Sequence, residues 1–271
     1  MFFNEETIDA VLEVVDAAGQ EILKRYESAA KVSVKDDGTP VTETDRASED
    51  IIVEGLSSLF PSDPIVAEER VSEGELPDIS GNSFWLVDAL DGTREYIKRS
   101  GEFTINIAFI SNGCPVFGII SCPVLGEVFV GAVGENKSVV KARLAGQWSR
   151  LSAPYSPSEP WRAVLSHGYK RSLTQLELPI GTLPIRASER RLGSALKFCR
   201  IAQGKADVYP RFGPTSEWDT AAGHAILLAL GGDVLTHEGQ KLAYGKLGEK
   251  FRNPHFLAVN SFLLNAIEEG V

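Results

Sequence analysis

The chain has 271 residues, of which 43% are hydrophobic and 24% are charged, a balance that excludes an intrinsically disordered or collagen-like chain. Its formal net charge of −10 makes it a poor binder of nucleic acid or of an anionic membrane surface. An anionic substrate would therefore need a local source of positive charge, either bound cations or a focused basic patch. No run of about 18 apolar residues occurs, so no membrane-spanning segment is expected.

The first elements in chain order are two helices. Apolar residues repeat with a helical period over residues 4–30, and Asn4 is the expected N-cap. A polar turn is expected over residues 35–40, where the sequence reads KDDGTP. A second helix is expected from near Asp45 to Pro61, because proline cannot continue a helix.

Strands are expected next. The apolar segment 64–67 predicts a short buried strand that leads to Glu68, and 84–87 predicts a second strand that ends at Asp88. The long apolar run 102–151, interrupted by Gly and Pro, predicts a meander of antiparallel strands.

Three prolines over residues 153–160 indicate a boundary between an N-terminal half, 1–155, and a C-terminal half, 156–271. The second half alternates strands and helices, which is typical of an α/β layer. The expected strands are 162–166, 183–187, 206–210, 233–236 and 256–259. The expected helices are 171–177, 192–203, 219–230 and 260–269.

The segment WLVDALDGT, residues 85–93, combines two carboxylates with a helix start. Asp88 and Asp91 lie across one turn and can share a hard divalent cation, to which the Leu90 carbonyl can add an oxygen ligand. The backbone N–H groups of Gly92 and Thr93 suit a phosphate. Turn formation by Asp-Gly is an equally weighted explanation of this motif taken alone.

Three further acids lie at element boundaries. Glu68 follows a strand, Asp219 opens an apolar helix, and Asp45 opens the second helix. Each has a simpler interpretation, since Asp45 and Asp219 also suit N-caps and Glu68 also suits a solvated strand end. Carboxylates gathered in one place would repel one another and raise each other's pKa, so the set as a whole predicts bound cations.

Two basic residues complement these acids. Lys197 lies on a predicted helix that begins near Ser194, and Arg211 precedes Asp219 by eight residues. Each is either an ordinary surface charge or a contact for a second anionic group of the substrate. The four histidines show no metal-ligand spacing, and His224 in an apolar helix suits a satisfied, half-buried residue.

The motifs PVTETD (40–45), AEE (67–69), WLVDALDGT (85–93) and EWDTAAG (217–223) resemble those of the inositol monophosphatase superfamily. Within it, DGTREYIKRSGEFTINIAFI (91–110), GSALKFC (193–199) and YPRFGPTSEWDTAAGH (209–224) resemble the bacterial 3′(2′),5′-bisphosphate nucleotidases of sulfate assimilation. The resemblance covers nearly the whole chain and implies an α/β fold built as a layered αβαβα sandwich. It also implies a lithium-sensitive, Mg²⁺-dependent phosphatase that hydrolyses adenosine 3′,5′-bisphosphate to AMP and phosphate by in-line attack of metal-activated water.

The resemblance also implies roles for individual residues. Glu68, Asp88 and the Leu90 carbonyl would hold a first Mg²⁺, and Asp88, Asp91 and Asp219 a second. Glu68 would reach a third, weaker ion. The implied catalytic residues are Asp45, Glu68 and Thr93. The implied substrate contacts are Glu68, Leu90, Asp91, Gly92, Thr93, Ser194, Lys197, Arg211 and Asp219.

The sequence departs from the family pattern in two places. The family usually has Pro where Ala89 stands, and its nucleotide-contacting His falls at Tyr169, with His167 two positions away. An inositol monophosphatase or a broad sugar-phosphate phosphatase stays open as the alternative. Two more distant alternatives are a haloacid-dehalogenase enzyme, whose two Asp residues are two apart rather than three, and a binding protein that has lost catalysis.

The expected partner is a small phosphate ester, without nucleic acid. Three cysteines that fit no metal or redox template, at Cys114, Cys122 and Cys199, together with an N-terminus unlike a signal peptide, favour the cytoplasm. Peripheral association with the inner membrane and a choice between homodimer and monomer stay open.

Overall fold

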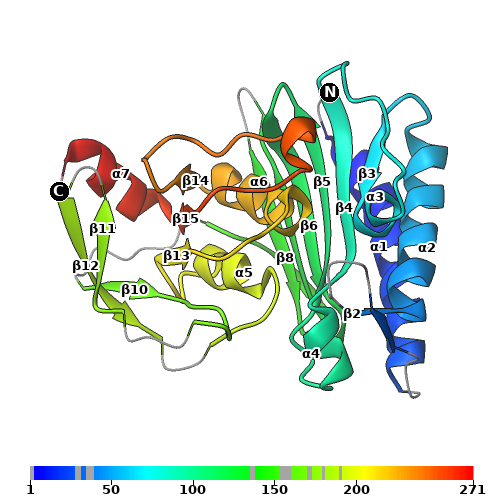
Figure 1. Ribbon diagram of the computed structural model, residues 1–271, viewed down its shortest axis with the longest axis horizontal. Coiled ribbons are helices and arrows are strands. Elements are labelled where there is room, and N and C mark those ends of the chain that lie inside the picture. The colour runs from blue at the N-terminus through cyan, green and yellow to red at the C-terminus, as the bar shows by residue number, and fades with distance from the viewer. Residues whose placement is uncertain are drawn as a thin grey trace.

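The computed structural model describes residues 3–27, 32–34, 40–134, 138–152, 160–169, 173–178, 181–188 and 191–270. Five layers follow one another across the molecule (Figure 1). Helices α1 (Glu5–Tyr26) and α2 (Glu43–Leu59) cover a seven-stranded sheet, and α5 (Leu196–Ala202) and α6 (Ala221–Ala229) lie between it and a six-stranded sheet. Helix α7 (Ser261–Glu269) covers the outer face of the second sheet. The αβαβα sandwich expected from the resemblance is confirmed.

The larger sheet has the strand order β3-β4-β5-β6-β7-β8-β9. Its strands are β3 (Ile65–Ala67), β4 (Ser83–Asp91), β5 (Thr104–Ser111), β6 (Cys114–Cys122), β7 (Glu127–Ala132), β8 (Val139–Leu144) and β9 (Gln147–Arg150). Only the β3–β4 pair is parallel among these neighbours, so the antiparallel meander predicted over 102–151 is confirmed.

The second sheet has the order β11-β12-β10-β13-β15-β14. Its strands are β10 (Trp161–Ala163), β11 (Gln175–Leu178), β12 (Gly181–Ala187), β13 (Val208–Arg211), β14 (Asp233–Thr236) and β15 (Phe256–Val259). The helix expected over 171–177 is wrong where the chain is described, because residues from Gln175 onward form a strand paired with β12. Leu176 is buried between exposed neighbours, which is the two-residue alternation of a strand rather than a helical period.

Three element boundaries differ from expectation. Helix α1 ends at Tyr26, and residues 28–30 of the expected helix lie outside the described part of the chain. Helix α2 begins at Glu43, because Thr42 rather than Asp45 is its N-cap. Strand β4 continues past Asp88 to Asp91, where a tight turn was expected. Most of the predicted 35–40 turn lies outside the described residues, and its last residue begins β2 (Pro40–Thr42), which pairs with β1 (Val32–Val34).

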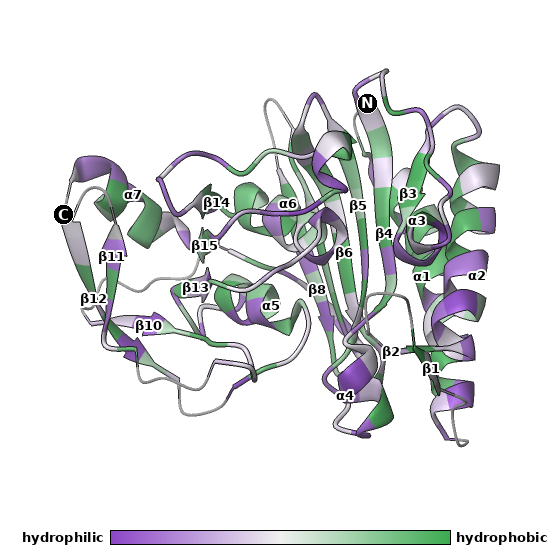
Figure 2. Cartoon of the chain, viewed as in Figure 1, coloured by the Kyte–Doolittle hydropathy of each residue, from purple (hydrophilic) through white to green (hydrophobic). Residues whose placement is uncertain are grey.

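Helix α6 packs between the two sheets. It is hydrophobic over nearly its whole surface (Figure 2), because it is buried between the two sheets. Its backbone lies so close to the larger sheet that a Cβ atom on Gly131 would lie 2.5 Å from the Cα of Ile226. This close approach brings the turn before α6, which contains Asp219, alongside β4. The division into halves at residue 155 stays a prediction.

Two further observations bear on the expectations from composition. No helix in the described ranges is both long enough and apolar enough to cross a membrane. The three cysteines are free thiols: Cys114 is exposed, and Cys122 and Cys199 are buried.

Candidate active site

The end of β4 positions two carboxylates in the interior of the molecule. Asp88 pairs with Asn106 of β5 and Asp91 pairs with Thr104, and the register shifts between these two pairs. Such a bulge takes the intervening residues out of the ladder and re-aims their side chains. Asp88 Oδ1 accepts a hydrogen bond of 3.0 Å from the Leu90 N–H, and Asp91 Oδ2 accepts one of 3.2 Å from Asn106 Nδ2. Both carboxylates are therefore held by backbone or side-chain donors in a fixed frame.

Acids from three distant segments converge on this point. Glu68 is the first residue of α3 (Glu68–Ser72), and Asp219 is the last residue of the 3-10 turn η2 (Glu217–Asp219). One carboxylate oxygen from each of Glu68, Asp88 and Asp219 lies within 4.8 Å of the others. Residues up to 151 positions apart in the chain thus form one carboxylate cluster.

Burial and mutual repulsion perturb the acids of this cluster. Burial raises the pKa of Asp88 and of Asp219 well above the usual range, and the neighbouring carboxylates, including Asp91, raise both further. Burial also raises the pKa of Asp91 to about 6, against the nearby Lys197 ammonium and the Asn106 hydrogen bond, which lower it. Added positive charge between these acids would oppose the shifts and favour their ionised forms.

A buried glutamate holds Glu68 in place. The Glu49 carboxylate accepts hydrogen bonds from the N–H groups of Glu69 and Arg70, at 2.8 and 3.0 Å, in the first turn of α3. An anion at a helix start satisfies donors that have no partner within the helix. Burial raises the pKa of Glu49 to about 7. This contact was not predicted, because nothing local in the sequence links Glu49 to the segment 20 residues further on.

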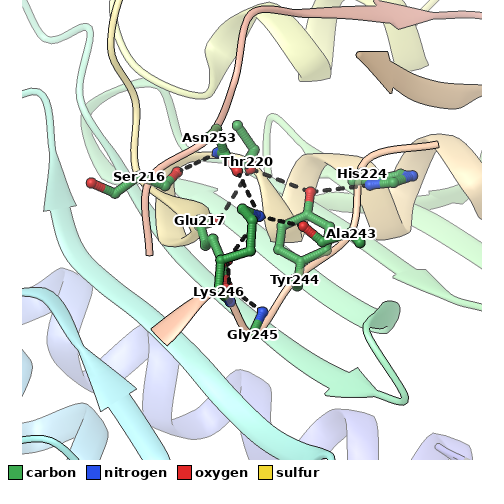
Figure 3. A network of polar contacts seen from close by, with 9 residues as sticks. All are labelled: Ser216, Glu217, Thr220, His224, Ala243, Tyr244, Gly245, Lys246 and Asn253. Carbon is green, nitrogen blue, oxygen red and sulfur yellow. Dashed lines mark hydrogen bonds and ion pairs between the residues drawn. The ribbon is translucent and has the colours of Figure 1, made fainter. Parts of the chain in front are cut away.

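The turn that carries Asp219 is fixed by a capping box. Asp219 Oδ2 accepts a hydrogen bond of 2.7 Å from the Ser216 N–H, so Asp219 is the third residue of the turn and not the N-cap of α6. A polar network contacts the residues on both sides of this turn, Ser216 and Thr220 (Figure 3). In it the Tyr244 hydroxyl donates to Thr220 Oγ1 at 3.3 Å and lies 3.0 Å from His224 Nδ1. His224 is hydrogen-bonded on both ring nitrogens, which confirms that it is a satisfied residue, but it is buried rather than half-buried because α6 lies between the two sheets.

Asp45 is linked to the cluster through Thr93. Asp45 Oδ2 accepts from the N–H and the hydroxyl of Thr42, at 2.8 and 2.6 Å, and Oδ1 accepts from the Thr93 hydroxyl at 2.8 Å. Burial raises the pKa of Asp45 above its usual value, although these hydrogen bonds oppose the effect. Asp45 is thus both a capping-box residue of α2 and the acceptor for a hydroxyl beside Asp91.

Gly92 makes the connection between β4 and α4 (Thr93–Ile97). Its φ of +101° lies in the left-handed region, and a Cβ atom there would meet the backbone of Glu102 and Phe103 at 3.3 Å. Any other residue would therefore displace Thr93 relative to Asp91.

The basic residues come from the second half of the chain. Lys197 is buried, its Nζ donates to the carbonyls of Leu192 (3.3 Å) and Ser194, and it stands 4.9 Å from the centre of the Tyr209 ring. Burial lowers the pKa of Lys197 to about 8, and nearby Asp91 opposes the shift. The ammonium therefore both shapes the loop at Ser194 and faces the carboxylates.

Arg211 lies at the end of β13. Its Nη1 donates to Ser166 Oγ at 3.0 Å and its Nη2 donates to the Pro214 carbonyl at 2.9 Å. These two contacts orient the guanidinium toward the same cleft as Lys197.

A cleft of about 680 Å³ connects these residues. Every site residue predicted from the sequence lines it except Asp45, which reaches it through Thr93. The lining includes Glu68, Asp88, Leu90, Asp91, Gly92, Thr93, Ser194, Lys197, Arg211 and Asp219.

His167 and Tyr169, the two residues near the position of the family's nucleotide-contacting His, lie in different surroundings. His167 lines the cleft, and its Nε2 lies 2.6 Å from the buried carboxylate of Glu102, which also accepts from the Gly193 N–H at 3.1 Å. Tyr169 instead packs against Phe212, with 6.2 Å between ring centres. Sequence reasoning missed Glu102, because its contacts with His167 and Gly193 span 65 and 91 residues.

The donor set fits a hard divalent cation. Its atoms are carboxylate oxygens, the ligands that Mg²⁺ prefers, and their crowding at Glu68, Asp88 and Asp219 is relieved by positive charge between them. The Leu90 carbonyl is a further oxygen at the bulge, since Leu90 has no register partner in β5. Soft metals are disfavoured because no cysteine lines the cleft among the residues described.

Comparisons with known proteins agree with this site. The inositol monophosphatase family pattern matches residues 4–265. The 3′(2′),5′-bisphosphate nucleotidase CysQ of Salmonella typhimurium is 39% identical over 252 residues, which are 92% of this chain and 98% of that protein. CysQ of Escherichia coli K12 is 37% identical over 256 residues, with the same coverage.

Solved structures have the same fold. CysQ from Bacteroides thetaiotaomicron, a bacterial member of the inositol monophosphatase family, superimposes with a TM-score of 0.73 at 31% identity, over 96% of this chain and 98% of that chain. Inositol monophosphatase from Anabaena superimposes with a TM-score of 0.69 at 26% identity, over 98% of this chain and 95% of that one. The chain therefore belongs to the inositol monophosphatase family.

Proposed function

We propose that this chain is a Mg²⁺-dependent phosphatase that hydrolyses adenosine 3′,5′-bisphosphate to AMP and phosphate. The convergence of Glu68, Asp88, Asp91 and Asp219 in one cleft with Lys197 and Arg211 carries the proposal. The likeness to CysQ nucleotidases over more than nine tenths of the chain supports the nucleotide as substrate.

Two or three Mg²⁺ would be held by Glu68, Asp88, Asp91, Asp219 and the Leu90 carbonyl. When bound, they would stabilise negative charge on the attacking and leaving oxygens of the displacement at phosphorus. The same carboxylates without cations would repel a phosphate, in a chain that already has a net charge of −10.

Asp45 and Thr93 position the attacking water in this proposal. The Thr93 hydroxyl donates its proton to Asp45 Oδ1, so its oxygen lone pairs are free to accept a hydrogen bond from water. The burial that raises the pKa of Asp45 also makes its carboxylate a stronger base, which suits removal of a proton through Thr93.

The start of α4 holds the phosphate. Gly92 and Thr93 line the cleft at the start of α4, and their N–H groups would bind a phosphate oxygen there. The left-handed conformation of Gly92 makes this arrangement possible.

The nucleotide side of the cleft is formed by Ser194, Lys197 and Arg211. Ser194 Oγ is buried and has no hydrogen-bond partner among the described residues, which leaves it available to a substrate hydroxyl or phosphate. Lys197 and Arg211 supply positive charge to the same side, and Asp219 of the carboxylate cluster is close enough to feel the charge of Arg211.

Phosphate release from adenosine 3′,5′-bisphosphate and from inositol 1-phosphate, measured side by side with and without Li⁺, tests this proposal. We expect the bisphosphate to have the higher kcat/KM and Li⁺ to inhibit its hydrolysis. A preference for inositol 1-phosphate would favour the alternative of an inositol or sugar phosphatase. A trapped aspartyl-phosphate would instead favour the haloacid-dehalogenase chemistry, which the family membership argues against.

We expect the chain to act in the cytoplasm on a small phosphate ester. Its state as monomer or homodimer, and any contact with the inner membrane, stay predictions for size measurement and for fractionation of cells.

A further inference from the structure

Two basic side chains at the edge of the cleft have no part in the chemistry described above. Lys250 and Arg252 both line the cleft, and both are exposed. In the part of the chain that the structure describes, neither side chain makes a hydrogen bond or an ion pair. Two neighbouring cations without partners, beside a cleft in an acidic protein, raise the local concentration of anions.

The segment that carries these cations is fixed at its beginning. Glu217 is 0% exposed, and its carboxylate accepts from the N–H groups of Gly245 and Lys246 at 2.7 and 2.8 Å. Lys246 Nζ also pairs with Glu217 Oε1 at 2.8 Å (Figure 3). Because Glu217 belongs to η2, the segment begins on the same turn that presents Asp219.

The end of the segment is attached to the same turn. Asn253 Nδ2 donates to the Ser216 carbonyl at 2.8 Å and to Thr220 Oγ1 at 3.0 Å (Figure 3). Arg252 forms an isolated antiparallel bridge with Ser216. The backbone at Arg252 is therefore held beside Ser216, which precedes Asp219 by three residues.

The backbone between the two ends is strained. Lys250 and Phe251 have φ values of +54° and +56°, in the left-handed region that non-glycine residues rarely adopt. Phe251 is fully buried and lies 6.0 Å from the ring of Trp218. Its burial anchors the segment, so that Lys250 and Arg252 on either side of it stand at the cleft. Strain of this kind persists where the surrounding contacts over-determine it, and it is often found at functional sites.

A hydroxyl next to these cations also lacks a partner. Thr215 Oγ1 lies in the wall of the cleft, is buried, and has no hydrogen bond within the described ranges. The Thr215 carbonyl accepts from the Asn253 N–H at 3.0 Å, and the preceding Pro214 carbonyl accepts from Arg211. Arg211, Thr215 and Arg252 are thus connected along one wall.

The other cations of the cleft are less available. Lys197 Nζ is engaged by two carbonyls and is buried beside Asp91, and Arg211 donates to Ser166 and to Pro214. Arg94 is exposed, but it lies on α4 with the phosphate-binding N–H groups. The free positive charge beside η2 is therefore that of Lys250 and Arg252.

We propose that Lys250, Arg252 and Thr215 form a second oxyanion subsite, which binds the substrate phosphate that is not at the carboxylate cluster. The ammonium and guanidinium groups supply charge-assisted hydrogen bonds, and the Thr215 hydroxyl supplies a neutral one. The inference rests on the proposed function, since a substrate with a single phosphate would leave the subsite empty.

The test compares two nucleotides that differ only in the second phosphate, adenosine 3′,5′-bisphosphate and adenosine 3′-monophosphate. The variant replaces both Lys250→Ser and Arg252→Ser. The matched control replaces Arg186→Ser and Lys205→Ser, which removes the same charge from exposed residues of a separate cavity of about 600 Å³. KM and kcat are measured for both nucleotides with saturating Mg²⁺, at low and high NaCl.

We expect the double variant to lose about tenfold or more of the wild-type KM preference for the bisphosphate, with kcat little changed. The control should keep that preference. Added NaCl should weaken the preference in the wild type more steeply than in the double variant, because salt screens exposed charges. A double variant that keeps both charges, Lys250→Arg with Arg252→Lys, should keep the preference, because charge rather than shape is the cause.

Two outcomes would overturn the subsite. If the variant keeps the wild-type preference, or if KM for the two nucleotides rises by the same factor, Lys250 and Arg252 do not bind the second phosphate. Failure of the proposed function looks different, because the wild type would then hydrolyse inositol 1-phosphate and neither nucleotide, which would overturn the subsite as well.

Discussion

Removal of one carboxylate should stabilise the metal-free protein, and Asp91→Asn tests this. Burial raises the pKa of Asp91 from 3.8 to about 6 in the folded chain. A folded-state pKa above the unfolded one means that the native state binds more protons, so stability falls as pH rises from about 4 through about 6. At about 1.4 kcal/mol per pH unit, the ionised Asp91 costs the metal-free fold about 3 kcal/mol at pH 7 and about half of that at pH 5.

The substitution also weakens the hydrogen bonds that Asp91 Oδ2 accepts from Asn106 and Thr104, at a cost of about 1 kcal/mol. We therefore expect Asp91→Asn to be about 2 kcal/mol more stable than the wild type at pH 7 in chelator, and nearly equal to it at pH 5. The stability comparison stops at pH 7. Burial lowers the pKa of Lys197 to about 8, so above pH 7 this lysine would also contribute to the pH dependence.

Urea unfolding followed by circular dichroism, in chelator at pH 5, 6 and 7, measures this difference. In saturating Mg²⁺ the order should reverse, because a ligand at 100 times its Kd stabilises the wild type by about 2.7 kcal/mol and the variant has lost a ligand. The reasoning is refuted if the variant is no more stable than the wild type at pH 7 in chelator, or if the difference does not grow with pH.

Three other substitutions test separate parts of the account. Thr93→Val removes the hydroxyl that donates to Asp45 and should lower kcat about 100-fold with little change in KM, whereas Thr93→Ser should retain most activity; equal kcat in the two variants would contradict the role. Lys197→Ala should raise KM for the nucleotide more than for inositol 1-phosphate, and equal increases would argue against a nucleotide contact. Gly131→Ala should lower the free energy of unfolding by about 2 kcal/mol in urea titration, because its Cβ would meet the Ile226 backbone at 2.5 Å; unchanged stability would contradict the close packing of α6.

The acids of the site could be predicted from the sequence because each lies at a boundary that local patterns reveal. Asp88 ends the apolar run of β4, although the strand itself continues to Asp91, and Glu68 directly follows β3. Asp45 and Asp219 were predicted to be N-caps, but each is the third residue of its helical turn. The true N-caps, Thr42 and Ser216, lie three positions earlier, and this spacing is the capping-box pattern that would have identified them. In both cases the cap and the site use the same carboxylate, so the two interpretations do not compete.

Contacts between distant segments could not be predicted. The Glu102 carboxylate joins His167 to the Gly193 loop, and Glu49 holds the first turn of α3, but no local periodicity indicates either contact. The segment around Lys250 reads as an ordinary polar loop, and only its attachment to Glu217 places its cations at the cleft. The strand β11 was missed because four residues are too few to show an unambiguous period.

Calorimetric titration of Mg²⁺ into the wild type and into Asp88→Asn, with phosphate release measured on the same samples, tests the central claim most directly. Asp88 belongs to both proposed cation sites and is 3% exposed, so its loss should abolish measurable Mg²⁺ binding in the millimolar range and phosphate release together, while circular dichroism stays native. Wild-type Mg²⁺ affinity in Asp88→Asn, or phosphate release by the wild type in excess chelator, would contradict the claim that these carboxylates bind the cations on which the reaction depends.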